Sequence, residues 1–354
     1  MKILVVAGGT GGHLFPAIRL VEEIRLQRSL DVFFVTSCRK QDRDILEGKN
    51  IRFETLPLIP LQSRKILPIL DFVIRLSLGT IKSSFLLFRF RPCRVIGFGG
   101  YISGPMLLLA ALFRIRTIIH EQNVCPGKTN RILARFVDRI AVSFPETVRY
   151  LKRFESKIIV SGNLLRQKLN STKKTSKKKG TFTVLAVGGS QGSHTLNRLI
   201  PKAIGLMQAD RKRLLDIIHI SGHQERDEVT RVYGDKCIKS RVLSFTQDID
   251  RFYDECDFVI ARAGATTVSE LLYLAKPSIL IPYPHAGGHQ RLNAKILGDA
   301  GAAILLEEHG LTAEDLRDAM IRLMDTGLLD SMSEKTKSSN MRDASHILIK
   351  ELIG

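Results

Sequence analysis

Short apolar runs alternate with amphipathic stretches along the whole chain, and the alternation starts again half-way. Runs rich in β-branched and aliphatic residues predict strands in the first half near 3–7, 31–36, 51–55, 93–97, 116–120, 138–142 and 157–160. In the second half such runs lie near 182–187, 214–220, 239–243, 256–260, 277–281 and 302–306. Helical patterns separate the runs, and strands that alternate with helices form parallel sheets covered on both faces. The sequence therefore predicts an α/β protein with two doubly wound domains.

The boundary between the two domains is predicted near Gly162-Asn163, where a strand ends in a turn dipeptide. The first domain would then cover residues 1–162 and the second 163–354. Residues 170–180 are polar and rich in lysine, so we expect them to lie outside both cores. A final helical pattern over about 330–352 is expected to pack back on the first domain. A chain of 354 residues is long enough for two such cores.

A glycine-rich loop follows the first predicted strand of each half. The first loop reads Gly-Gly-Thr-Gly-Gly-His over 8–13, and the second reads Gly-Gly-Ser-Gln-Gly-Ser over 188–193. In both cases a helical pattern comes next. Glycine lets backbone amides approach an anion closely, and a helix N-terminus favours negative charge. Each loop therefore predicts a phosphate-binding cradle, and its occurrence in both domains predicts a ligand between them.

A nicotinamide cofactor is the main alternative ligand for the first loop. The dinucleotide fingerprint needs glycine or alanine where this chain has Leu14. The strand that follows ends in Ser-Cys-Arg at 37–39 rather than in the acidic residue that binds a ribose hydroxyl. Arg39 could still pair with a 2′-phosphate, so an NADP-dependent oxidoreductase stays open as an alternative.

Polar residues follow several other predicted strands, where open α/β sheets bind their ligands. They form a second glycine-rich loop at Gly97–Gly104, the runs His120–Asn123 and Arg262–Glu270, and a His-Gln pair that ends at Gln290. His13, at the mouth of the first loop, is a candidate general base near neutral pH. Backbone amides at Gly264–Thr267 would suit a diphosphate, and Glu270 would accept both hydroxyls of a ribose. The alternative for His13 and Glu270 is a local role at a helix start.

The formal net charge of +19 points to an anionic partner. We do not expect nucleic acid, because the chain has no Trp, only 6% aromatic residues and no zinc-finger spacing. The five scattered cysteines contain no Cys-x-x-Cys pair, which fits a reducing cytoplasm and argues against structural zinc. Two Asp-x-Asp strings, at 42–44 and 248–250, fall at predicted helix starts, where acids complement the helix dipole. No bound metal is therefore expected.

The stretch from Arg64 to Arg94 departs from the regular alternation. It is dense in Ile, Leu and Phe and carries seven basic residues against one acid, Asp71. Pro68 and charged residues interrupt any run long enough to cross a bilayer. Apolar bulk beside cations is typical of an element that lies on an anionic membrane surface. The alternative is a helix that covers the sheet, with its arginines extended to solvent.

Six motifs occur in order along the chain. They are Gly-Gly-Thr-Gly-Gly-His at 8–13, Gly-Phe-Gly-Gly-Tyr-Ile-Ser-Gly-Pro at 97–105, His-Glu-Gln-Asn at 120–123, Gly-Gly-Ser-Gln-Gly at 188–192, Arg-Ala-Gly-Ala-Thr-Thr-Val-Ser-Glu at 262–270 and His-Gln-Arg-Leu-Asn-Ala at 289–294. Together they resemble the MurG family of bacterial N-acetylglucosaminyltransferases over essentially the whole chain. The resemblance implies a GT-B fold, with two Rossmann-like domains and the active site in the cleft between them. It also implies an inverting reaction with no required metal or other cofactor.

The resemblance further implies the substrates. N-acetylglucosamine would pass from UDP-N-acetylglucosamine to the 4-hydroxyl of the N-acetylmuramyl unit of undecaprenyl-linked lipid I, which gives lipid II in peptidoglycan synthesis. The enzyme would be peripheral, on the cytoplasmic face of the inner membrane. Matched position by position, the family's donor-site residues are Thr10, Gly11, Gly12, Asn123, Arg166, Ser190, Thr246, Ala265, Thr266, Thr267, Val268, Ser269, Glu270 and Gln290. His13 is the candidate catalytic base.

Two further alternatives differ from this reading in testable ways. A UDP-N-acetylglucosamine 2-epimerase would share the fold, but it would not need the basic apolar stretch at 64–94. A non-catalytic membrane-binding protein would need that stretch, but it would not need so many polar loop motifs.

Overall fold

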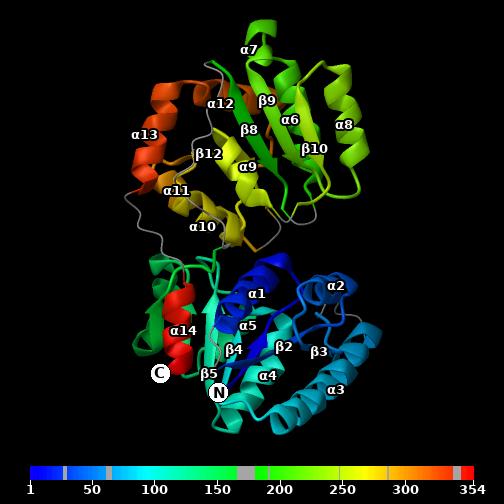
Figure 1. Ribbon diagram of the computed structural model, residues 1–354, viewed down its shortest axis with the longest axis vertical. Coiled ribbons are helices and arrows are strands. Elements are labelled where there is room, and N and C mark those ends of the chain that lie inside the picture. The colour runs from blue at the N-terminus through cyan, green and yellow to red at the C-terminus, as the bar shows by residue number, and fades with distance from the viewer. Residues whose placement is uncertain are drawn as a thin grey trace. The chain divides into compact units, whose positions relative to one another are not determined.

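The computed structural model describes residues 1–26, 30–60, 66–165, 180–189, 192–246, 248–284, 287–337 and 344–354. The chain forms two compact units (Figure 1). One comprises Met1–Leu165 with Arg342–Gly354, and the other comprises Arg166–Met341. The predicted fold class is confirmed, because each unit is a parallel sheet with helices on both faces.

The first unit is built on a seven-stranded parallel sheet in the order β3-β2-β1-β4-β5-β6-β7. Its strands are β1 (Lys2–Val6), β2 (Asp31–Ser37), β3 (Phe53–Leu56), β4 (Arg94–Gly97), β5 (Arg116–Glu121), β6 (Arg139–Val142) and β7 (Ile158–Val160). Its helices are α1 (Gly11–Arg25), α2 (Lys40–Gly48), α3 (Ile66–Phe90), α4 (Gly100–Leu112), α5 (Lys128–Leu133), α14 (Ser345–Ile353) and the 3-10 helices η1 (Pro145–Tyr150) and η2 (Lys152–Lys157). Successive strand residues face opposite sides, so Ile3 and Val5 pack with α1 and α14 while Leu4 and Val6 pack with α3 and α4.

The second unit has a six-stranded parallel sheet in the order β10-β9-β8-β11-β12-β13. Its strands are β8 (Phe182–Val187), β9 (Leu215–Ile220), β10 (Ser240–Leu243), β11 (Phe258–Ala261), β12 (Ser278–Leu280) and β13 (Ala303–Leu305). Its helices are α6 (His194–Gly205), α7 (Ala209–Arg213), α8 (Arg226–Asp235), α9 (Ile249–Glu255), α10 (Ala265–Tyr273), α11 (His289–Asp299), α12 (Ala313–Leu323) and α13 (Thr326–Lys337). Val184 and Ala186 of the central strand pack against α6, α8 and α12 in one buried cluster.

Each sheet has one place where the direction of strand addition reverses. After β3 the chain returns to pair β4 with β1, and after β10 it returns to pair β11 with β8. Val6 is in register with Gly97, and Val187 is in register with Ala261. The two loops that follow such a strand pair leave the same sheet edge side by side. Open α/β sheets bind ligands at this position.

The C-terminal residues form two helices where the sequence pattern predicts one. α13 belongs to the second unit, whereas α14 packs against α1 in the first. The residue before α14 donates its backbone N–H to the carbonyl of Asn163, at an N···O distance of 3.0 Å. The helical pattern over about 330–352 therefore covers the end of α13, which belongs to the second unit, and α14, which packs on the first.

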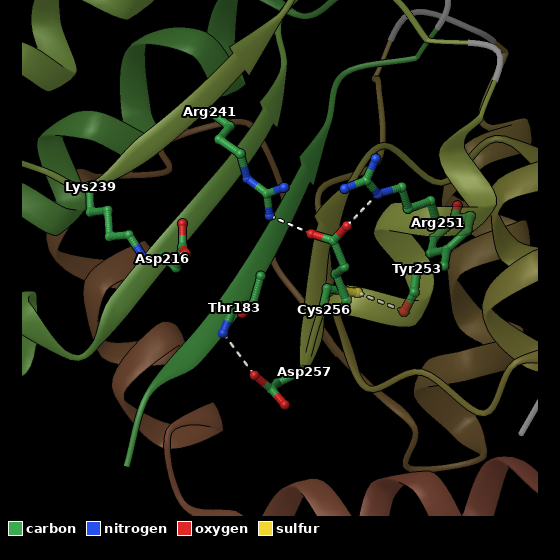
Figure 2. A network of polar contacts seen from close by, with 9 residues as sticks. Thr183, Asp216, Lys239, Arg241, Arg251, Tyr253, Cys256 and Asp257 are labelled. Atoms are coloured by element: carbon green, nitrogen blue, oxygen red, sulfur yellow. Dashed lines mark hydrogen bonds and ion pairs between the residues drawn. The ribbon is translucent and has the colours of Figure 1, made fainter. Parts of the chain in front are cut away.

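Polar contacts close the amino edge of the second sheet (Figure 2). The amide of Thr183 on β8 donates to the carboxylate of Asp257 over 2.7 Å, and the amide of Asp257 donates back to the carbonyl of Thr183 over 2.8 Å. The carboxylate of Glu255 accepts hydrogen bonds from Arg241 and Arg251. These contacts hold the start of β11 beside β8, at the edge of the second sheet opposite the glycine-rich loop that follows β8.

Candidate functional site

The loops after β1 and β4 interlock at the switch point of the first sheet. Gly9 adopts φ +84°, and a Cβ at this position would lie 2.9 Å from a ring carbon of Tyr101. Gly100 adopts φ +73°, and its Cβ would lie 3.3 Å both from the carbonyl oxygen of Gly8 and from Nδ1 of His13. Both positions need glycine for backbone conformation and for space. The first glycine-rich loop and the Gly97–Gly104 loop thus form one packed structure.

His13 lies in the first turn of α1, at the mouth of this structure. Its imidazole is half-buried, and Nδ1 is 3.0 Å from the hydroxyl of Thr10. Thr10 is exposed and precedes the helix in an extended conformation, and Gly11 and Gly12 begin the helix. The structure therefore brings together the predicted residues Thr10, Gly11, Gly12 and His13 at the N-terminus of a 15-residue helix, where amides attract negative charge.

A buried carboxylate that the sequence analysis passed over orients Asn123. Glu121 is 2% exposed, and its Oε1 accepts the backbone N–H of Asn123 over 2.9 Å and its side-chain amide over 3.2 Å. The other oxygen, Oε2, accepts from the backbone of Gly127 over 3.0 Å and from the side chain of Asn130 over 2.8 Å. The only sequence signal for Glu121 is its place beside Asn123 in the His120–Asn123 run.

His120 of the same run has a structural role. Burial lowers its pKa from 6.5 to about 4, so the imidazole is neutral at physiological pH. Nε2 donates to the carbonyl oxygen of Gly162 over 3.1 Å, and Nδ1 accepts from the side-chain amide of Gln122 over 3.0 Å. These contacts tie the end of β5 to the chain beyond β7.

In the second unit, the N-terminus of α10 and the residue Glu270 lie as the motif predicts. Gly264 precedes the helix, and Ala265, Thr266 and Thr267 form its first turn, whose amides point out of the helix end. Glu270 is 2% exposed, and its Oε2 accepts the hydroxyl proton of Tyr253 over 3.0 Å. Tyr253, on α9, carries no signal in the sequence that would connect it to this carboxylate.

Val268 and Ser269 belong to the buried side of α10. Both side chains are 0% exposed, and the hydroxyl of Ser269 donates to the carbonyl of Ala265 over 2.8 Å. The amide of Val268 is taken up by the carbonyl of Gly264 within the helix. The structure therefore separates the predicted run into the first helical turn at 265–267, two core residues and the carboxylate of Glu270.

Two more predicted donor-site residues, Thr246 and Gln290, lie on other loops of the same sheet edge. Thr246, beyond β10, is half-buried, and its hydroxyl accepts the amide of Asp248 over 3.0 Å. Gln290, in the first turn of α11, accepts the amide of Tyr283 through Oε1 over 2.9 Å. Arg166 and Ser190 lie outside the described residues. The structure adds Phe245, 38% exposed next to Thr246, whose ring stacks on His223 at a centroid distance of 6.4 Å.

Arg262 connects the loops of this edge and was given no role by the sequence analysis. Its side chain is 9% exposed and forms a two-pronged ion pair with Glu308, beyond β13. Nε donates to the hydroxyl of Ser193 over 3.0 Å, and Nη1 donates to the carbonyl of Ile281 over 3.1 Å. The guanidinium also lies 5.5 Å from the ring centroid of Tyr283. The only sequence signal for this role was the position of an arginine directly after the apolar run Phe258–Ala261.

Within the described ranges, no three His, Cys, Asp or Glu side chains are grouped as a metal site would require. In the same part of the chain, none of the helices is long and apolar enough to cross a bilayer.

Comparison with known proteins places both units in one family. The glycosyltransferase family 28 N-terminal domain matches residues 3–142, and the corresponding C-terminal domain matches residues 183–348. A protein of Desulfotalea psychrophila named UDP-N-acetylglucosamine–N-acetylmuramyl-(pentapeptide) pyrophosphoryl-undecaprenol N-acetylglucosamine transferase is 38% identical over 91% of this chain and 88% of its own length. A protein of the same name from Syntrophus aciditrophicus is 36% identical over 98% of this chain and 97% of its own length.

Solved structures agree with this placement. The crystal structure of Acinetobacter baumannii MurG superposes with a TM-score of 0.80 at 27% identity, over 100% of this chain and 99% of that one. The predicted GT-B fold is therefore confirmed. A UDP-N-acetylglucosamine 2-epimerase superposes with a TM-score of 0.71 at 16% identity, over 100% of this chain and 95% of that one, and this likeness concerns the fold alone.

Proposed function

The chain belongs to glycosyltransferase family 28 and to the family of UDP-N-acetylglucosamine–N-acetylmuramyl-(pentapeptide) pyrophosphoryl-undecaprenol N-acetylglucosamine transferases, and from that premise we propose its reaction. It transfers N-acetylglucosamine from UDP-N-acetylglucosamine to the 4-hydroxyl of the N-acetylmuramyl unit of lipid I, and the product is lipid II. The observation that supports this proposal most strongly is that relatives of this name match nearly the whole chain. The epimerase and oxidoreductase alternatives are set aside for the same reason.

The donor nucleotide is proposed to bind at the carboxyl edge of the second sheet. The first-turn amides of α10 at 265–267 would face its diphosphate, where negative charge develops as UDP leaves. Glu270 would accept the ribose hydroxyls, with its orientation set by the hydroxyl of Tyr253. Phe245 offers an exposed ring beside Thr246 for the base. The proposed donor set also includes Thr10, Gly11, Gly12, Asn123, Arg166, Ser190 and Gln290.

His13 is proposed as the general base for the acceptor hydroxyl. Because Nδ1 faces the hydroxyl of Thr10, Nε2 is the nitrogen that would take the proton. The attack of the 4-oxygen on the anomeric carbon breaks the bond to UDP and inverts the configuration at that carbon. We propose that the reaction proceeds without a metal ion, with charge on the leaving UDP stabilised by amides of α10.

An anionic membrane surface is proposed as the docking site of the first unit. Helices α3 and α4 pack together and expose a group of large apolar side chains, comprising Ile69, Leu70, Val73, Ile74, Leu78, Ile81, Phe85, Phe88, Leu108, Leu112 and Phe113. Ile81, Phe88 and Leu112 are 67%, 65% and 73% exposed. So many large apolar side chains exposed on two helices that pack together are uncommon on a soluble protein and point to an interaction site. We refer to these residues as the α3–α4 patch.

Cations surround the carboxyl ends of α3 and α4, where the patch ends. Arg89, Arg91, Arg114 and Arg116 are all exposed there. Arg91 and Arg114 adopt left-handed conformations, with φ of 49° and 57°, at helix ends where glycine is favoured. An arginine in this conformation is less stable than a glycine by about 1 kcal/mol at each position. This cost supports a role for the positive charge of both side chains. By contrast, Arg75 and Lys82 pair with Asp71 and Glu54.

The docking proposal places the protein peripherally on the cytoplasmic face of the inner membrane, where a lipid-linked acceptor is found. A transfer assay tests the whole proposal. Labelled UDP-N-acetylglucosamine and a short-chain lipid I analogue are incubated with the protein, with and without EDTA. We expect labelled disaccharide product in both reactions. Free N-acetylmannosamine or UDP without acceptor-dependent product would instead indicate epimerase chemistry, and loss of activity in EDTA would contradict metal independence.

A further inference from the structure

The peptide of Gly9 in the first glycine-rich loop is held from both sides by charged side chains of the connection between β2 and α2. The backbone N–H of Gly9 donates to Oδ2 of Asp42 over 2.8 Å, and the carbonyl of Gly9 accepts from the guanidinium of Arg39. Asp42 is 3% exposed, and the same oxygen also accepts the hydroxyl proton of Ser37 over 2.5 Å. Asp42 is therefore more than the helix-start acid that its sequence position suggests.

The loop around Gly9 is also closely packed against its neighbours. A Cβ at Gly8 would lie 2.7 Å from the hydroxyl of Thr36 and 3.1 Å from Oδ2 of Asp42. On its other side Gly9 rests against the ring of Tyr101. The Gly9 peptide is therefore held by the hydrogen bonds with Asp42 and Arg39 and packs against Tyr101.

The same peptide sets the position of His13. Thr10 follows Gly9 directly, and its hydroxyl is 3.0 Å from Nδ1 of His13. The backbone N–H of His13 donates to the carbonyl of Thr10 over 3.2 Å. A displacement of Gly9 would therefore also displace Thr10 and, through its hydroxyl, the imidazole of His13. A shift of about 1 Å in a reacting group can lower a rate by about a hundredfold.

We propose that Asp42 is a positioning residue of the transferase: it holds the Gly9 peptide and so places His13 for the reaction. The inference rests on the proposed role of His13. It also assigns the amide of Gly9 to Asp42 rather than to a substrate phosphate, which narrows the predicted phosphate cradle to Thr10, Gly11 and Gly12. Asp44, two residues on, is exposed on α2 and provides a matched control.

Steady-state kinetics of three variants test the proposal. Asp42→Ala should lower kcat about 10- to 100-fold, with a smaller change in the donor KM, because only Thr10, Gly11 and Gly12 of the proposed donor residues lie on this loop. Asp42→Asn keeps an oxygen that can accept the Gly9 N–H, so we expect it to recover at least about a third of the wild-type kcat. Asp44→Asn should match wild type. A kcat of Asp42→Ala within about threefold of wild type would overturn the proposal.

Two additions keep the result interpretable. If Asp42→Ala does not fold, as judged by its circular dichroism, Arg39→Met removes the opposite contact with Gly9 from an exposed position and should give the same loss of kcat. If Asp44→Asn loses activity together with Asp42→Ala, and added divalent metal restores it, the Asp-x-Asp string is a metal site and the positioning role is wrong.

A double-mutant cycle separates this inference from the role of His13. If Asp42 acts through His13, Asp42→Ala should cause little further loss of kcat in a His13→Ala background. An equal loss in both backgrounds would overturn the link to His13. A third outcome is that His13→Ala changes kcat less than about tenfold while Asp42→Ala still lowers it. The general-base proposal would then fail, and the positioning of His13 for that reaction would fail with it. The contact between Asp42 and the glycine loop would still be required for activity. General-base catalysis contributes about 10²–10⁴-fold, so these outcomes are well separated.

Discussion

Arg262 and Glu308 form a buried two-pronged ion pair, with Nη1 2.7 Å from Oε2 and Nη2 3.1 Å from Oε1. The two residues follow β11 and β13, so the pair spans three neighbouring strands of the second sheet. Glu308 also accepts the hydroxyl of Thr195 in α6, and Arg262 reaches Ser193 at the start of that helix. One ion pair thus joins the glycine-loop end of α6 to the loops after β11, β12 and β13.

Removing one member of this pair should destabilise the second unit strongly. Arg262→Met would leave the Glu308 carboxylate, which is 17% exposed, without its guanidinium partner. Losses of about 3–5 kcal/mol are typical when one partner of a buried pair is removed. The double variant Arg262→Met with Glu308→Leu should recover part of that stability, because no unpaired charge remains. Urea unfolding of the four proteins of this cycle measures the coupling, and additive effects would contradict it.

Glu270→Ala should weaken donor binding. A hydrogen bond to a charged group contributes about 1.5–3 kcal/mol, which corresponds to about a 10- to 100-fold rise in the KM for UDP-N-acetylglucosamine. Tyr253→Phe removes the hydroxyl that orients the carboxylate and leaves the charge in place, so its KM should rise less, about 2- to 10-fold. Both KM values are measured at saturating acceptor. An unchanged KM for Glu270→Ala would reduce this residue to a structural member of α10.

Vesicle binding should depend on the arginines at the ends of α3 and α4. The double variant Arg91→Gly with Arg114→Gly removes two charges from positions whose backbone favours glycine, so the fold should be as stable as wild type or more so. Each cation near an anionic surface contributes about 1 kcal/mol, so the affinity for anionic vesicles should fall about 10- to 30-fold. Sedimentation with the vesicles measures this affinity.

The matched control for that experiment is Arg91→Lys with Arg114→Lys, which keeps both charges. It should bind vesicles like wild type, and binding of both proteins should weaken as salt rises, because charges are screened over about 10 Å at 0.1 M salt. Wild-type protein that remains in the supernatant at low salt, with or without vesicles, would contradict the docking proposal. Activity on a short-chain acceptor should survive in both variants.

Stability should fall on acidification below about pH 6.5. Burial lowers the pKa of His120 in the first unit and of His219 in the second from 6.5 to about 4. Between these values the unfolded state binds more protons than the folded state, so the free energy of unfolding decreases as pH falls. Each histidine contributes about 1.4 kcal/mol per pH unit within this window. Urea unfolding at several pH values measures the slope, which should become shallower in His219→Gln; an unchanged slope in that variant would contradict the prediction.

The local elements of this protein could be read from its sequence. All thirteen strands among the described residues lie where apolar runs predict them. The glycine loops after β1 and β8 were equally visible, because a backbone with positive φ and close approach, as at Gly9, accepts little other than glycine. Such features depend on a few consecutive residues, so the period or the composition of those residues predicts them directly.

Contacts between distant parts of the chain were decided only by the tertiary structure. Gly9 and Asp42 are 33 residues apart, and Arg262 and Glu308 are 46 residues apart. The C-terminal helix α14 packs on α1, although the local pattern joined it to α13. For the two residue pairs the order of strands in the sheet brings the partners together, and strand order leaves no period in the sequence. The sequence by itself therefore determined where the loops are and which of them carry a glycine-rich pattern. The tertiary structure decided which buried charges hold those loops in place, because a charge is buried only where the fold supplies its partner.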